Sequence, residues 1–111
     1  MAEATEAQAA YAALATALLR DDGVAHGGAR RRGGFGATAL TVGGSIFAML
    51  VDDRLVVKLP AARVLALVAS GEGGRFEPGH GRVMREWVAL GPERRAAWPG
   101  LAREALAFVR G

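Results

Sequence analysis

Two adjacent carboxylates, Asp52 and Asp53, are the first residues of this sequence whose type could support catalysis. A carboxylate pair can act as general acid and base when its surroundings separate the two pKa values. Adjacent residues of a strand point to opposite sides, however, and an exposed turn desolvates neither group. Because aspartate tolerates tight turns and bonds to its own backbone, we interpret the pair as turn residues.

The other catalytic and metal-binding patterns are incomplete. Ser45 lies in Gly43-Gly44-Ser45-Ile46-Phe47, which lacks the last glycine of a nucleophile elbow. Neither His26 nor His80 has a second histidine at ligand spacing, and Glu77 precedes His80 in an expected loop, where spacing sets no geometry. Cysteine is absent, which excludes disulfides and thiolate ligands. We therefore expect no catalytic residue, no metal and no cofactor.

Two glycine-rich segments match phosphate-binding loops only in part. In "GGARRRGG", Gly28 and Gly33 are correctly spaced, but Gly34 occupies the place of the Walker lysine. "GHGRVM" contains Gly79 and Gly81 but lacks the third glycine of a dinucleotide fingerprint. Neither segment therefore predicts a nucleotide-binding loop.

The strongest binding candidate is the basic loop 26–36, "HGGARRRGGFG". Arginine and lysine side chains bind nucleic-acid phosphates, and the candidates are Arg30, Arg31 and Arg32, with Arg54, Lys58, Arg82 and Arg85 as neighbours. Phe35 or Trp87 could stack on a base. The alternative is a solvated loop, because a net charge of +3 permits nucleic-acid contact without requiring it.

Length and composition indicate one domain over residues 1–111. Apolar residues make up 51% of the chain, enough for a core, yet no apolar run approaches the roughly 18 residues of a membrane span. The first residues include Glu3 and Glu6 in place of the basic region of a secretory signal. We expect a cytoplasmic protein.

The element that positions the acidic pair is an expected three-strand antiparallel meander. Strands 37–42, 45–51 and 54–60 are joined by Gly43-Gly44 and by Asp52-Asp53, both suited to two-residue turns. Such turns predict the pairs Leu50–Leu55, Ala48–Val57, Ile46–Leu59 and Thr41–Ile46. They place one apolar set on the opposite surface: Leu40, Val42, Phe47, Met49 and Val56.

Helical spacing predicts helices over 4–20, after Pro60, from Pro92 and from near Pro99. Their expected core residues are Tyr11, Leu14, Leu18 and Leu19, then Val64, Leu65 and Val68, then Leu101, Leu106, Phe108 and Val109. Alternation predicts a strand over 82–90, "DDG" at 21–23 is expected to end the first helix, and 26–36 and 71–81 are expected loops. The order is α-βββ-α-β-α, an α+β domain with an antiparallel sheet. Both sheet faces are apolar, so we expect helices on one and a loop, helix or second subunit on the other; a homodimer is predicted.

Three segments together resemble the TfoX/Sxy amino-terminal domain family, which is related to YjbR/MmcQ-like proteins: "GGSIFAMLVDDRLVVKLPAARV", "GEGGRFEPGHGRVMREWV" and "LAREALAFVR". The resemblance runs from about Phe35 to Val109. It implies a two-layer α+β domain with an antiparallel sheet and transfers no catalytic residue. The family includes regulators of natural competence, and DNA binding has been proposed for related proteins. Ser45 stands where lysine is common, and the helical second domain of competence regulators is absent, so a competence role is not carried over.

We therefore expect a non-enzymatic, cytoplasmic interaction or regulatory domain that contacts nucleic acid through the arginine-rich loop. The alternative is a protein–protein or homodimerisation module that uses an apolar sheet face, with Phe47 or Met49 exposed for the purpose. A small-molecule binder or an unrecognised hydrolase is a third hypothesis.

Overall fold

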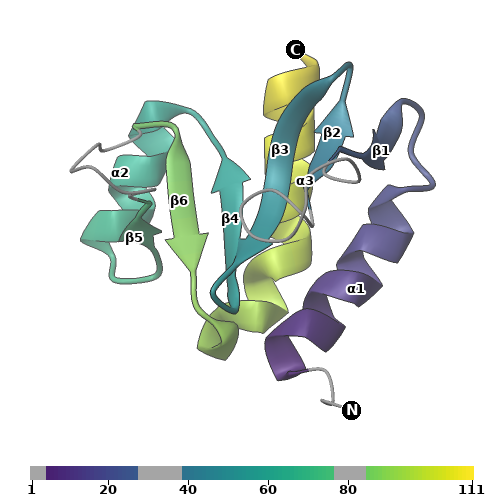
Figure 1. Cartoon of the computed structure of the whole chain (residues 1–111). Helices are drawn as coiled ribbons and strands as arrows, with labels where there is room; N and C mark the ends of the chain where they lie inside the picture. The colour runs from purple at the N-terminus through teal and green to yellow at the C-terminus, as the bar shows by residue number, and fades with distance from the viewer. Residues whose placement is uncertain (1–4, 28–38, 77–84) are drawn as a thin grey trace.

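A computed structural model describes residues 5–27, 39–76 and 85–111 of the chain. Its helices are α1 (Glu6–Leu18), α2 (Ala61–Ala69), the 3-10 helix η1 (Pro92–Ala97) and α3 (Trp98–Arg110). Its strands are β1 (Val24–His26), β2 (Leu40–Val42), β3 (Ser45–Val51), β4 (Arg54–Lys58), β5 (Gly74–Arg75) and β6 (Trp87–Leu90). The strands form one antiparallel sheet in the order β1-β2-β3-β4-β6-β5 (Figure 1). The predicted α+β class is confirmed.

The three-strand meander is present, and both of its turns contain two residues. Gly43 and Gly44 have φ of 60° and 84°, and Asp52 and Asp53 have φ of 51° and 62°. Positive φ at both central positions matches the right-handed twist of the flanking strands. The Asp53 carboxylate accepts a hydrogen bond from the Thr5 hydroxyl at 3.1 Å, and Thr5 also caps α1. The acidic pair is thus confirmed as a turn, and it ties the start of α1 to the sheet.

A β-bulge in β3 changes the predicted register. The pairs Leu50–Leu55, Ala48–Val57 and Thr41–Ile46 are present as predicted. Leu40, however, lies opposite Ala48, so Phe47 is an extra residue on β3. The described β3–β4 ladder ends at Ala48–Val57 and does not include the predicted pair Ile46–Leu59.

The bulge divides the apolar set that was predicted to share one surface. Leu40, Val42 and Phe47 belong to the core beneath the helices, together with Ala48, Leu55 and Val57. Met49 and Val56 belong to a second cluster. The single-surface prediction is therefore wrong, because two successive residues of β3 point to the same side and invert the alternation on either side of them.

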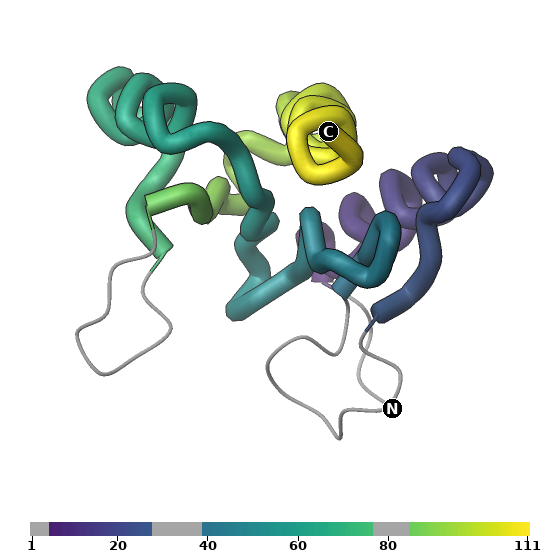
Figure 2. Tube along the Cα trace, turned by 90° about the horizontal axis from the view of Figure 1, so that it is seen from above, coloured from purple at the N-terminus to yellow at the C-terminus, as the bar shows by residue number. Residues whose placement is uncertain are grey.

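All three α-helices cover the same face of the sheet (Figure 2). Trp98, at the start of α3, is completely buried there, and its indole nitrogen donates to the Gly91 carbonyl at 3.2 Å. The predicted core residues Tyr11, Leu14, Leu18, Leu101 and Leu106 are buried. Leu19, Val68, Phe108 and Val109 are half-buried. In α2, Val64 and Leu67 are buried, whereas Leu65 is 53% exposed. The prediction for Leu65 is wrong, because the side of α2 that packs against the sheet carries Val64 and Leu67 and does not include Leu65.

The loop predictions are wrong at two short strands. β1 overlaps the expected loop 26–36 at His26 and begins at Val24, where no strand was predicted, and β5 lies within the expected loop 71–81. β1 pairs with the equally short β2, and β5 pairs with the longer β6. Strands of three and two residues are too short to show a period of their own. The predicted strand 82–90 begins at Trp87 in the structure, after a turn at Arg85 and Glu86, while 82–84 lie outside the described residues.

The second face of the sheet has its own small core. Met49, Val56, Phe76 and Ala89 are at most 3% exposed, and Ile46, Val51 and Trp87 pack against them half-buried. None of the three described α-helices lies on this face (Figure 2). The burial is achieved within a single chain, so it does not require the predicted second subunit.

The positive φ at the first turn predicts a stability effect. Replacing Gly43 and Gly44 with alanine should lower the free energy of unfolding by about 1 kcal/mol per site, because a Cβ disfavours left-handed backbone. Urea denaturation followed by circular dichroism measures the change. Gly100→Ala is the control, since that glycine lies in α3 with open space at its Cβ position. Alanine there should be neutral or stabilising. Equal losses at both places would contradict the role of the turn.

Candidate functional site

The predicted basic residues divide into those the structure describes and those it does not. The predicted cations that lie outside the described residues are Arg30, Arg31, Arg32 and Arg82. Phe35, Glu77 and His80 lie outside them as well. Their proposed roles stay predictions. Arg54, Lys58 and Arg85 are described, and the structure places only two of them together.

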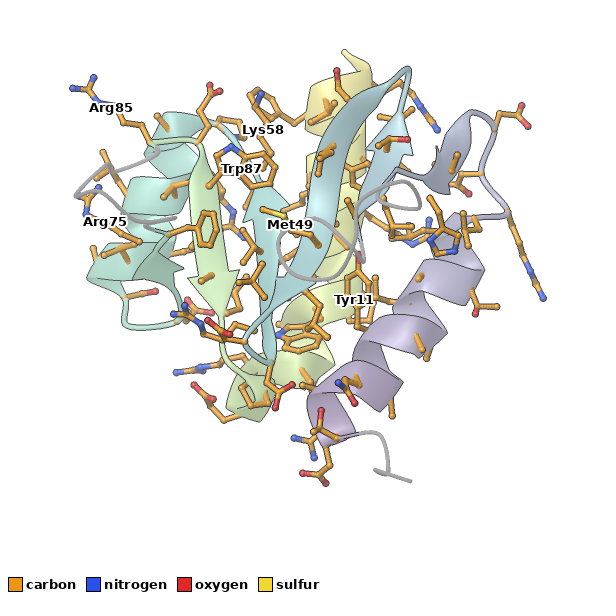
Figure 3. The ribbon with its side chains drawn as sticks, viewed as in Figure 1. Tyr11, Met49, Lys58, Arg75, Arg85 and Trp87 are labelled. Carbon is orange, nitrogen blue, oxygen red and sulfur yellow. The ribbon has the colours of Figure 1, made fainter. Side chains whose placement is uncertain are left out.

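Lys58 and Trp87 lie side by side. They are direct partners in the β4–β6 ladder, and Trp87 packs half-buried on the second face. Lys58 follows Val56 by two residues, so strand alternation puts it on that face as well. Arg85 precedes Trp87 at the same end of the sheet (Figure 3). We call Lys58, Arg85 and Trp87 the basic end of the sheet.

One carboxylate lies within the basic end. The Lys58 ammonium is 4.0 Å from the Glu86 carboxylate, and the two side chains are 36% and 46% exposed. The Glu86 carbonyl accepts from the Leu59 amide at 2.9 Å, which holds the turn against the end of β4. An exposed pair at this distance is weak and leaves Lys58 able to exchange Glu86 for another anion. Arg85 adds a second positive charge to the basic end of the sheet.

A second group of cations was not predicted. Arg75 of β5 and Arg85 line one hollow of about 280 Å³, to which Ala61 and Leu65 of α2 also contribute among the described residues. We call these four residues the arginine hollow. It lies on the helix side of the sheet, because Arg75 is opposite the core residue Val88. The sequence predicts a loop at Arg75, because a two-residue strand is too short to show the alternation of apolar and polar residues by which strands are recognised.

The start of α2 adds to the positive field of the arginine hollow. Pro60 caps α2 without a side-chain hydrogen bond, and the first turn carries no acidic residue. Arg63 of α2 does not contribute a free charge, since its guanidinium donates two hydrogen bonds to Glu104, at 3.1 and 3.2 Å. That hydrogen bonding and the charge of Glu104 raise the pKa of Arg63.

Arg54 does not join the other predicted cations. It begins β4 whereas Lys58 ends it, which separates their Cα atoms by about 13 Å. Arg54 lines a different hollow, of about 480 Å³, which also contains the carboxylates of Asp52, Asp53, Glu72 and Glu93. Arg54 therefore lies among carboxylates and apart from Lys58, and its role in nucleic-acid binding stays a prediction.

The remaining polar residues form no recognisable reaction centre among the described residues. His26 lies on the edge strand β1 and lines a groove of about 480 Å³ with Gln8, Tyr11 and Thr16 of α1. No cluster of three or more histidine, aspartate or glutamate side chains suited to a metal occurs in 5–27, 39–76 and 85–111. No helix in these ranges is long and apolar enough to cross a membrane.

The apolar face required by the alternative function is not exposed. Phe47 is completely buried beneath the helices, and Met49 is 3% exposed on the second face. The condition that either residue be available to a partner is therefore not met. Homodimerisation stays a prediction, which a sedimentation measurement of the mass across the micromolar range would test.

Comparison with known proteins identifies no relative, so a functional conclusion rests on the geometry of the described residues. No family model, no curated protein and no solved structure matches this chain.

The basic end predicts a charge-selective response of Trp87. The chain has two tryptophans, and Trp98 is completely buried. Relative to a neutral tryptophan derivative under the same conditions, Trp87 should be quenched more strongly by iodide and more weakly by caesium, because nearby cations concentrate anions and exclude cations. Stern–Volmer titrations measure the difference. Trp87→Phe should abolish the preference, and Lys58→Gln should reduce it. An iodide-to-caesium quenching ratio equal to that of the neutral tryptophan derivative would show that Trp87 does not lie in a positive field.

Proposed function

We propose that this chain is a non-enzymatic interaction domain that binds nucleic acid at the basic end of its sheet. The observation that carries the proposal is the placement of Lys58 beside half-buried Trp87, with Arg85 at the same end. Cations bind backbone phosphates, and an indole can stack on a base whatever its identity. The proposed binding is therefore electrostatic and has little sequence preference.

The undescribed arginines belong to the same proposal. The chain segment that carries Arg30, Arg31 and Arg32 follows Gly27 and rejoins the described structure at Ala39, a member of the second-face cluster. Trp87 packs against that cluster. Arg82 precedes Arg85 by three residues. These four arginines lie outside the described residues, so they enter the proposal through their charge and their positions in the sequence.

We further propose a regulatory, cytoplasmic domain of the TfoX amino-terminal type. The support is the resemblance of the Gly44–Ala48 hairpin and the Phe76–Trp87 segment to that family. The two-residue turn before Ser45 and the buried Phe76 agree with structural roles for both motifs. Under this proposal the protein acts by occupying nucleic acid or recruiting a partner to it, and performs no reaction of its own.

Removal of charge from the basic end should weaken nucleic-acid binding. We expect Lys58→Gln and Arg85→Gln each to reduce the affinity for a short fluorescent single-stranded DNA several-fold at about 50 mM salt. Each change should also flatten the plot of log K against log salt by about 0.7 for every phosphate that the variant no longer neutralises. Trp87→Leu should lower the affinity about tenfold, because a leucine cannot stack on a base. Fluorescence anisotropy titrations at several salt concentrations measure all three effects.

Arg103→Gln provides the matched control. It removes the same charge from α3, where Arg103 pairs with Asp21 at 3.5 Å, and it should leave the affinity nearly unchanged. Replacing Arg30, Arg31 and Arg32 with alanine should weaken binding similarly for all sequences. If neither the basic end nor these arginines affects the affinity, or if no DNA or RNA binds at low salt, the proposal is wrong.

A further inference from the structure

Among the described residues, the lining of the arginine hollow contains two positive charges and no carboxylate. These described lining residues are Arg75, Arg85, Ala61 and Leu65. Neither arginine has an ion-pair partner within the described ranges, whereas Lys58, Arg63, Arg95 and Arg103 all have one. The two guanidinium groups therefore have hydrogen-bond donors and charge to offer a ligand.

Two apolar side chains, Ala61 and Leu65, also line the arginine hollow. Leu65 is 53% exposed and is the one large apolar side chain so exposed in the described part of the chain. A single exposed leucine is common on protein surfaces and indicates nothing by itself. Here Leu65 and Ala61 line the same hollow as Arg75 and Arg85, so one ligand can contact apolar and cationic groups together.

We propose that the arginine hollow binds a phosphate monoester whose organic group lies on Leu65. A phosphate monoester carries between one and a half and two negative charges near neutral pH, which matches two guanidinium groups. The planar fork of arginine also fits the paired oxygens of a phosphate. A hollow of about 280 Å³ is at the lower end of small-ligand sites and accommodates a phosphate with a small organic group.

This inference is independent of nucleic-acid binding. The basic end uses Lys58 and Trp87 on the second face, while the arginine hollow uses Arg75 and Leu65 on the helix side. Arg85 is common to both. The two proposals can therefore fail separately: Lys58→Gln should affect DNA alone, and Arg75→Gln should affect the phosphate monoester alone.

Phenyl phosphate is a suitable probe, because it combines a dianion with a flat apolar group. In an NMR titration of the ¹⁵N-labelled protein at constant ionic strength, it should shift the side-chain Nε–Hε signals of Arg75 and Arg85 in a saturable manner. Arg75→Gln and Arg85→Gln should each weaken binding about tenfold or more, as loss of a charged hydrogen bond does. Arg103→Gln should have no effect.

Two comparisons test the charge match and the apolar contact. Phenyl sulfate has the same shape with one negative charge, and it should bind several-fold more weakly than phenyl phosphate. Inorganic phosphate should also bind more weakly, and Leu65→Ser should reduce the affinity for phenyl phosphate but not for inorganic phosphate. The side chains substituted in the phosphate experiments, those of Leu65, Arg75, Arg85 and Arg103, are all exposed, so these variants should fold. Unsaturable shifts, or saturable binding that survives Arg75→Gln, would overturn the proposal.

Discussion

Two-residue turns with positive φ are the constraint on which the rest of this structure depends. Such a turn fixes the pairing register of its two strands. It therefore determines which residues are cross-strand partners and on which side of the sheet each side chain lies. The turn at Asp52-Asp53 puts Leu55 and Val57 beneath the helices and directs Arg54, Val56 and Lys58 to the second face. Once β4 is oriented in this way, its pairing with β6 determines where Trp87 lies.

The strand order brings cationic and aromatic side chains together from distant parts of the chain. β6 lies between β4 and β5, so its two neighbours supply different partners. On one side Lys58 meets Trp87, and on the other Arg75 meets Val88. Arg85, in the turn before β6, lines one hollow with Arg75 and lies at the same end of the sheet as Lys58 and Trp87 (Figure 3). One short strand thereby places cations on both faces of the same end of the sheet.

The two ends of β4 and β6 differ in charge. Lys58 and Arg85 lie where β4 ends and β6 begins, whereas Asp52, Asp53 and Glu93 surround the opposite end. A polyanion that approached this face would be drawn to one end and repelled from the other. This asymmetry explains why Arg54, although it belongs to the same strand as Lys58, has no part in the proposed nucleic-acid surface.

The sequence by itself determined the local features of this protein: the tight turns at Gly43-Gly44 and Asp52-Asp53, the order of the long elements, and the structural role of the acidic pair. These follow from backbone preference and from hydrophobic period, which act between near neighbours. Tertiary structure alone decided the bulge at Phe47, the edge strands β1 and β5, the exposure of Leu65 and the meeting of Arg75 with Arg85. Each of these depends on pairing between distant residues, whose register and burial are chosen by the partner strand or the sheet face and leave no periodic trace in the chain.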